Sequence, residues 1–179
     1  MLTLDEALGR LLSSIRPLAE AEPVATFDAL GRVLAAGVRS ALDVPPADNT
    51  SMDGYALRCA DVSATGAVLR VAQRIPAGAV GRPLEPGTAA RIFTGAQVPP
   101  GADAVVMQEQ CEALGEQVRV NAVPQPGQWI RRRGEDVQHG AEVLAAGTRL
   151  TPQALGLAAS VGAATLTVSR RPRVALFFS

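Results

Sequence analysis

The chain has 179 residues and a formal net charge of zero at pH 7, so no overall field attracts it to a polyanion, and we expect neither a nucleic-acid nor a membrane partner. It contains arginine but no lysine, which excludes Schiff-base or P-loop lysine chemistry within these residues. A single His139, with Cys59 and Cys111 at no metal-like spacing, argues against a protein-ligated zinc centre.

The first predicted element is an amphipathic helix that ends near Pro17. Apolar residues recur there at helical spacing, namely Leu4, Ala7, Leu8, Leu11, Leu12 and Ile15. Thr3 and Glu6 can form a capping box at its start. The acidic residues of this segment do not suit a signal peptide, and no apolar run approaches the roughly 20 residues of a spanning helix. We therefore expect a cytoplasmic protein whose cysteines are buried and not joined in a disulfide.

A second short helix is predicted over residues 29–36 (ALGRVLAA), capped by Thr26 or Asp28 and ending near Gly37. Residues 38–44 then favour an extended conformation. From Pro45 to about His139, short β-like runs at 67–71, 89–93 and 104–107 are separated by Gly and Pro turns, a spacing typical of a small barrel or sandwich.

The helical signal returns at Thr151-Pro152, which can cap and open a helix through Ser160, with Gly162 beyond its end. Helical pieces therefore flank a β-rich insert. We predict an α/β plus all-β fold: a discontinuous helix-and-strand domain built from residues 1–46 and 140–170, and an inserted small β-barrel-like domain of residues 47–139.

The tail predicts the start of a third domain at residues 171–179. A charged linker with a proline precedes residues 174–178 (VALFF), an apolar run typical of a buried parallel strand. Such a strand needs a crossover and parallel neighbours. We therefore expect the chain to be cut at the start of that domain.

Three segments of the insert concentrate polar chemistry. The first is PPADNTSMDGYA, residues 45–56, where Asp53-Gly54 is a tight-turn dipeptide. Its carboxylate could hold a cation, or Asp53 could be present only for its turn propensity in a hairpin.

The second segment is ARIFTGAQVPPGADAVV, residues 90–106. Thr94-Gly95 after a β-run places a hydroxyl and backbone N–H groups at a strand end, where they could hold an oxyanion. The alternative is a plain Gly/Pro connection in which Asp103 caps a turn.

The third segment is RRRGED, residues 131–136. If the backbone is extended, Arg131 and Arg133 share one face and could grip an anion beside Glu135 and Asp136. The alternative is a solvated surface whose charges pair with one another.

In order and spacing, these segments resemble those of the molybdopterin molybdenumtransferases, the MoeA and gephyrin E-domain family. The family usually has PPFDNSAMDGYA, RIxTGAxxPxGADAVV and RxxGED, whereas this chain has Ala47 where an aromatic residue is usual, and Glu109 stands where an acidic residue is common. The tail RPRVALFFS, residues 171–179, is similar to the start of the family's molybdopterin-binding domain.

The resemblance implies insertion of molybdate into adenylylated molybdopterin with release of AMP, assisted by Mg²⁺. It implies catalytic roles for Asp53, Thr94 and Asp136, with Asp53 and Asp136 also as metal ligands. The residues implied in binding the cofactor substrate are Asn49, Ser51, Gly95 and Arg131. It further implies a homodimer that works with other molybdenum-cofactor assembly proteins or molybdoenzymes.

Two alternatives to catalysis by the chain itself stay open. Because the resemblance covers only about the first half of a family member, the chain is expected to be inactive by itself. It could instead be a non-catalytic dimerising scaffold of the same pathway. A Ser/His/Asp hydrolase is disfavoured, because His139 has no recognisable nucleophile motif nearby.

Overall fold

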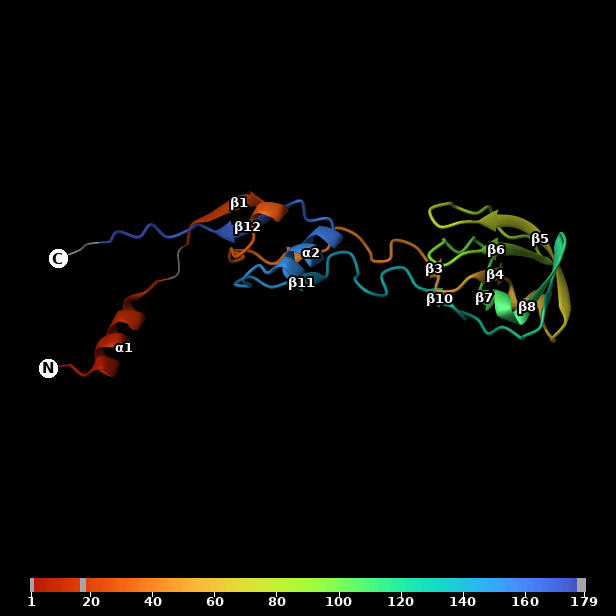
Figure 1. The fold of residues 1–179 in the computed structure, drawn as a ribbon, viewed down its shortest axis with the longest axis horizontal. Helices are drawn as coiled ribbons and strands as arrows, with labels where there is room; N and C mark the ends of the chain where they lie inside the picture. The colour runs from red at the N-terminus through yellow and green to blue at the C-terminus, as the bar shows by residue number, and fades with distance from the viewer. Residues whose placement is uncertain (1, 17–18, 177–179) are drawn as a thin grey trace. The chain divides into compact units, whose positions relative to one another are not determined.

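A computed structural model describes residues 2–16 and 19–176 of the chain. By its internal contacts the chain divides into a terminal unit, Met1–Ala41 with Gly140–Ser179, and a middle unit, Leu42–His139. Figure 1 traces the chain from red at the N-terminus to blue at the C-terminus. No helix among the described residues is long and apolar enough to cross a membrane.

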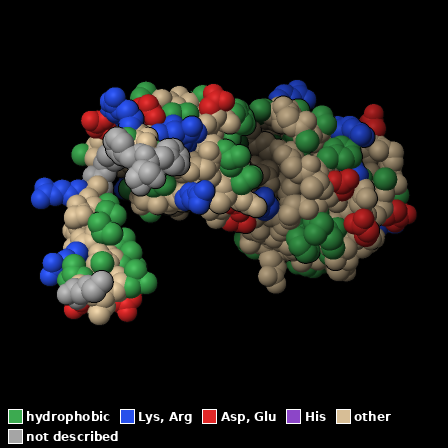
Figure 2. Space-filling view, turned by 60° about the vertical axis from the view of Figure 1, so that its left-hand side comes forward, with side chains coloured by type: hydrophobic (Ala, Val, Ile, Leu, Met, Phe, Trp, Pro, Cys, Tyr) green, Lys and Arg blue, Asp and Glu red, His purple; other side chains and the backbone are tan. Residues whose placement is uncertain are grey.

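Helix α1 (Leu4–Ser14) opens the terminal unit and confirms the first prediction. The Thr3 N–H donates to Glu6 Oε2 over 2.8 Å, and the Glu6 N–H donates to Thr3 Oγ1 over 3.3 Å, which completes the capping box. None of the residues of α1 is buried. Hydrophobic side chains therefore lie exposed along this helix, as the lower left of Figure 2 shows.

Two small antiparallel sheets and a second helix complete the terminal unit. Their elements are β1 (Ala21–Ala25) paired with β12 (Thr165–Ser169), β2 (Val38–Arg39) paired with β11 (Glu142–Leu144), the 3-10 helix η1 (Thr26–Asp28), and α2 (Pro152–Ser160). Buried side chains come from both ends of the chain, among them Leu34, Leu150, Leu166 and Val168. Residues far apart in sequence therefore share one apolar interior.

Helix α2 follows its predicted signals closely. The Ala154 N–H donates to Thr151 Oγ1 over 3.2 Å, and Pro152 occupies the first turn. Gly162 lies just beyond the helix with φ at +88°, a conformation that glycine adopts at little cost.

One prediction for the terminal unit is wrong, and the strand predicted for the third domain is not formed in its described part. Residues 29–36 form no helix, because their backbone groups pair with distant segments: the Leu34 N–H donates to Thr148 O, and the Leu150 N–H donates to Arg32 O. Residues 174–176 form no strand, and Val174 and Leu176 are about three-quarters exposed, 75% and 76%. The rest of the predicted tail strand, residues 177–178, lies outside the described residues.

The middle unit is built on a six-stranded mixed sheet in the order β7-β4-β6-β5-β9-β8. Its strands are β4 (Gly54–Leu57), β5 (Ala67–Ile75), β6 (Thr88–Ile92), β7 (Ala104–Met107), β8 (Cys111–Leu114) and β9 (Gln117–Val120). Only the β5–β6 pair is parallel; the other ladders are antiparallel. A separate small sheet pairs β3 (Asn49–Thr50) with β10 (Ile130–Arg131), and η2 (Cys59–Asp61) and η3 (Gln108–Gln110) are 3-10 helices.

The sheet buries side chains on both faces. One cluster includes Tyr55, Leu57 and Val106, and the other includes Ala56, Ile92 and Val105. Neighbouring residues of one strand enter different clusters because successive strand side chains point to opposite faces. The predicted β-runs at 67–71, 89–93 and 104–107 are thus confirmed as β5, β6 and β7, and the α/β plus β fold class holds in its coarse form.

The cysteines agree with the predictions only in part. Both are free thiols, as expected, but both are half-buried and lie at the edge of the cluster that contains Tyr55. Burial is the main cause that raises the pKa of each to about 11. Neither cysteine is a reactive thiolate near neutral pH.

Candidate functional site

Strand β3 brings the three predicted segments together inside the middle unit. On one side, the Thr50 N–H donates to Ala96 O over 3.0 Å and the Gly95 N–H donates to Thr50 O over 2.8 Å. On the other side, Thr50 pairs with Ile130 and Asn49 with Arg131. Residues of all three segments therefore gather around one short strand through backbone hydrogen bonds.

Asp53 and Thr94 form the most direct link between the first two segments. The Thr94 N–H and the Thr94 hydroxyl both donate to Asp53 Oδ1, over 2.8 and 2.7 Å. These two bonds, with a smaller contribution from the charge of Arg91, hold the pKa of the Asp53 carboxyl below its ordinary value. Asp53 is half-buried and Thr94 is exposed, so the pair consists of an ionised carboxylate and its donors at the surface.

Gly54 fixes the bend that carries Asp53. A Cβ atom at this position would lie 2.0 Å from Val106 O, so the tight approach of β4 to β7 requires glycine. The Gln108 N–H donates to Asp53 O over 3.0 Å, and the Met52 N–H donates to Thr50 Oγ1 over 3.1 Å. These bonds hold a bend at residues 51–53, whereas Gly54 already lies in β4, so the predicted tight turn at Asp53-Gly54 is not formed and β3 and β4 make no hairpin.

The backbone anion site expected at Thr94-Gly95 is not formed. The Thr94 N–H donates to Asp53, the Gly95 N–H to Thr50 O, and the Ala96 N–H to Phe93 O. The Thr94 hydroxyl also donates to Asp53. Since these donors all have protein acceptors, Thr94 orients Asp53, and an oxyanion would need donors from elsewhere.

Asp136 is paired with Arg131. The Nη2 of Arg131 donates to both carboxylate oxygens of Asp136 over 2.6 Å, and Glu135 lies 3.5 Å from Arg131 Nε. Asp136 is the main cause that raises the pKa of Arg131. The chain turns after Arg131, so the strand alternation that would align Arg131 with Arg133 does not apply.

The other two arginines of this segment, Arg132 and Arg133, form ion pairs with aspartates in and just before the first segment. Arg132 Nη1 lies 2.7 Å from Asp48 Oδ2, and Arg133 Nε lies 2.6 Å from Asp43 Oδ2. The Arg133 N–H also donates to Asp48 Oδ1 over 2.8 Å. The segment therefore pairs its charges with acidic residues in and around the first segment.

The carboxylates suit a magnesium ion that is shared with a substrate better than an all-protein cage. No group of three or more His, Cys, Asp or Glu residues in the described parts of the chain could hold a metal. Asp53 Oδ2, however, has no donor among the described residues, and Mg²⁺ is commonly bound by one or two carboxylates plus phosphate and water. No hydrogen bond or ion pair between described residues joins Asp53 directly to Asp136.

A hollow of about 200 Å³ adjoins β3. Asn49 and Gly95 line it, together with Ala47, Pro46, Val80 and Gln97. The small side chain of Ala47, where the resembling family has an aromatic residue, therefore faces this hollow. Ser51 lies elsewhere on the same loop, and its N–H and hydroxyl donate to Trp129 O over 3.1 and 3.3 Å.

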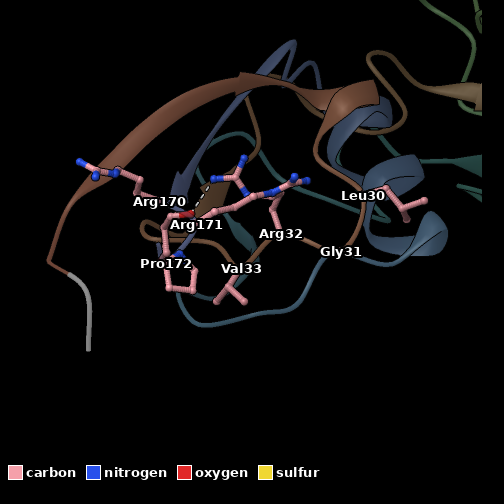
Figure 3. A pocket seen from close by; sticks show the side chains of 8 residues that line it. Leu30, Gly31, Arg32, Val33, Arg170, Arg171 and Pro172 are labelled. Atoms are coloured by element: carbon pink, nitrogen blue, oxygen red, sulfur yellow. Dashed lines mark hydrogen bonds between the residues drawn. The ribbon is translucent and has the colours of Figure 1, made fainter. Parts of the chain in front are cut away.

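Another pocket lies in the terminal unit and contains no residue of the three segments. Arg32 and Arg171 extend across it in Figure 3, whereas Arg170 points away. Arg32 Nη2 donates to Ser169 O over 2.7 Å and pairs with Glu22. Its guanidinium therefore holds β12 near β1 and serves the fold.

Three residues that sequence reasoning did not select lie at or near the site. Trp129 has a left-handed backbone, φ +56°, unusual for a bulky residue, and its carbonyl accepts from Ser51. Arg91 donates to Gly54 O over 2.8 Å, and Arg74 stacks on Phe93. Two-residue spacing from Arg91 in β6 to Phe93, just beyond its end, could have placed these side chains together; Arg74 and Trp129 gave no comparable signal.

The chain matches known proteins over most of its length. Residues 2–162 match the family model described as MoeA N-terminal region (domain I and II). It is 42% identical over 163 residues to the molybdopterin molybdenumtransferase of a Nostoc strain, and 40% identical over 177 residues to that of Haemophilus influenzae. These alignments cover 88% and 97% of this chain but 37% and 43% of the relatives, so the chain spans about four-tenths of their length.

Solved structures agree with the sequence matches. The crystal structure of a molybdopterin biosynthesis moeA protein from Pyrococcus horikoshii superimposes with a TM-score of 0.87 at 36% identity. The match covers 94% of this chain and 46% of that protein. The relatives are named as transferases or as proteins of molybdopterin biosynthesis, and none of these is named as a scaffold.

Proposed function

Because this chain belongs to the MoeA N-terminal region family, we propose that it supplies part of the active site of a molybdopterin molybdenumtransferase. In the proposed reaction, molybdate is inserted into adenylylated molybdopterin and AMP is released. The observation that carries the proposal is the surface carboxylate of Asp53, which Thr94 holds by two hydrogen bonds.

Asp53 is the proposed catalytic carboxylate. Thr94 uses both donors on Oδ1, which keeps the carboxylate ionised and leaves Oδ2 to orient a water molecule or hold a cation. Bound Mg²⁺ would neutralise charge on the substrate phosphate. Asp136, the second proposed metal and catalytic residue, is restrained by its ion pair with Arg131.

The proposed contacts to the cofactor substrate come from the loop around β3. Asn49 and Gly95 line the hollow beside this strand. Arg131 pairs with Asn49 in the ladder of β3 and β10, and Ser51, which follows β3, donates to Trp129 O. Because the chain spans about four-tenths of its relatives, we expect these residues to form one side of the complete site. The chain by itself is then expected to release no AMP.

We propose a homodimer, as the family resemblance implies, in a cytoplasmic pathway with other cofactor-assembly proteins or molybdoenzymes as partners. Helix α1 supports an interaction role, because Leu4 is 83% and Leu11 66% exposed, and exposed apolar residues on one helix favour burial against a partner. Sedimentation of the chain and of a Leu11→Glu variant tests this point. A wild-type monomer would overturn the dimer proposal.

The catalytic proposal is tested by calorimetric titration of molybdate into the chain with Mg²⁺ present. Asp53→Asn keeps an oxygen for the Thr94 donors but removes the charge, and it should weaken the Mg²⁺-dependent part of binding about tenfold. Asp103→Asn is the matched control, since that carboxylate accepts the Cys59 N–H over 2.7 Å. Equal binding by the wild type and Asp53→Asn would refute the role of Asp53.

A further inference from the structure

Two arginines stack on one phenyl ring at the end of the six-stranded sheet. The guanidinium carbon of Arg74 lies 4.4 Å from the ring centroid of Phe93, and that of Arg91 lies 4.5 Å from it. Arg91 also lies 5.3 Å from the ring of Tyr55. Arg74 and Arg91, called the arginine pair below, share Phe93, which directly precedes Thr94 in the chain.

A β-bulge places Arg74 in this cluster. Val71 pairs with Ala89 and Gln73 with Ala90, so Ala72 is an extra residue on β5. The bulge reverses the alternation of the strand, and Arg74 becomes the direct neighbour of Arg91 in the ladder. Without the extra residue, the side chain of Arg74 would lie on the opposite face.

Neither arginine of the pair forms an ion pair with a carboxylate among the described residues. Within the described residues no ion pair involves Arg74 or Arg91, whereas Arg131, Arg132 and Arg133 all have acidic partners. Arg91 instead donates to Gly54 O and to Gln108 Oε1, and Arg74 is exposed. Two adjacent cations repel each other, and an anion bound between them would remove this repulsion.

We propose that the arginine pair binds a tetrahedral oxyanion next to Asp53. Arg74 supplies the exposed guanidinium fork, and Arg91, anchored to Gly54 O, fixes the position of the second charge. Planar guanidinium groups suit such anions because they donate two parallel hydrogen bonds. The inference rests on the proposed function for the identity of the anion, which is either molybdate or the phosphate of a nucleotide.

The test is calorimetric titration of the chain with molybdate, orthophosphate and AMP, each without Mg²⁺. Arg74→Gln should weaken binding about tenfold, and Arg74→Lys should retain part of it because the charge remains. Arg70→Gln is the matched control, since it removes the same charge from the same strand ahead of the bulge. It should leave binding unchanged, and circular dichroism verifies the fold of each variant.

The outcomes separate this inference from the catalytic proposal. Without Mg²⁺, Asp53→Asn should bind the anion at least as tightly as the wild type, because a negative charge near Arg91 is removed. The anion that binds the wild type most tightly, and whose binding is weakened in Arg74→Gln, identifies the ligand as molybdate or as the phosphate of a nucleotide. Binding by Arg74→Gln that equals the wild type for all three anions, or an equal loss in Arg70→Gln, overturns the inference.

Discussion

Replacement of Gly54 by alanine should destabilise the middle unit and displace Asp53. The added Cβ would lie 2.0 Å from Val106 O, 2.9 Å from Val106 C and 3.1 Å from Met107 Cα, all backbone atoms of β7. Ordinary contacts begin near 3.4 Å. Since no side chain can rotate away to make room, β4 and β7 must separate by more than an ångström.

The cost follows from that separation. Overpacking of a close contact typically costs about 1–3 kcal/mol, and the hydrogen bonds nearest Gly54 in the β4–β7 ladder would weaken by about 1 kcal/mol each. We therefore expect a loss of about 3 kcal/mol. For a domain of about 100 residues this corresponds to a melting temperature lower by roughly 15 °C.

Trp129 provides the assay, because it is the single tryptophan of the chain and lies in the middle unit. Its fluorescence during thermal unfolding reports on this unit. Gly66→Ala is the control: the new Cβ meets nothing within 4 Å, and only the positive φ of +88° is strained, at about 1 kcal/mol. Equal melting temperatures for Gly54→Ala and the wild type would refute the close-approach reasoning.

Three further predictions concern capping, acid stability and thiol reactivity. Thr151→Ala removes the α2 cap and should cost the terminal unit about 1 kcal/mol in calorimetry; no change would show that Thr151 Oγ1 is dispensable. The pKa values of Asp53 and Asp48 are lowered by backbone N–H donors, so their stabilisation is present above about pH 4 and is lost as pH falls through the lowered values. Trp129 emission, followed during an acid titration, should change as the middle unit loses this stability. Emission that does not change as pH falls would contradict the prediction. Cys59 and Cys111, with pKa values raised to about 11, should be alkylated by iodoacetamide at pH 8 much more slowly than in unfolded chain, and equal rates would contradict their burial.

Local signals in the sequence predicted the elements that local interactions build. The capping box at Thr3 and the Thr151-Pro152 start are properties of a few adjacent residues, and both helices begin there. The predicted β-like runs at 89–93 and 104–107 likewise match β6 and β7 within one residue, whereas β5 extends four residues beyond the predicted 67–71. The chemistry of a cap or a strand face is contained in its own residues, so it can be read before any partner is known.

Elements that depend on distant partners could not be predicted in the same way. Residues 29–36 have a helical pattern, but their backbone pairs with Thr148 and Leu150, and tertiary pairing overrides weak helix propensity. The bulge at Ala72 leaves no recognisable local signal, so the stacking of Arg74 on Phe93 was not foreseeable. The sequence likewise could not show that the N–H groups of Thr94 and Gly95 donate to Asp53 and to Thr50 O, because these acceptors lie about 40 residues earlier in the chain.

The three segments restrain one another, and this explains why their residues are needed together. Asp48 holds Arg132 and the backbone of Arg133, and Thr94 holds Asp53. Gly54 permits the approach of β7. Much of the pattern shared with the family therefore stabilises the loop arrangement, whereas chemistry requires groups that these contacts leave unsatisfied. Within the described residues, Asp53 Oδ2 and the guanidinium of Arg74 are such groups. A substitution at Arg74 should therefore alter binding with little effect on stability, whereas one at Asp53 also removes the carboxylate that Thr94 holds.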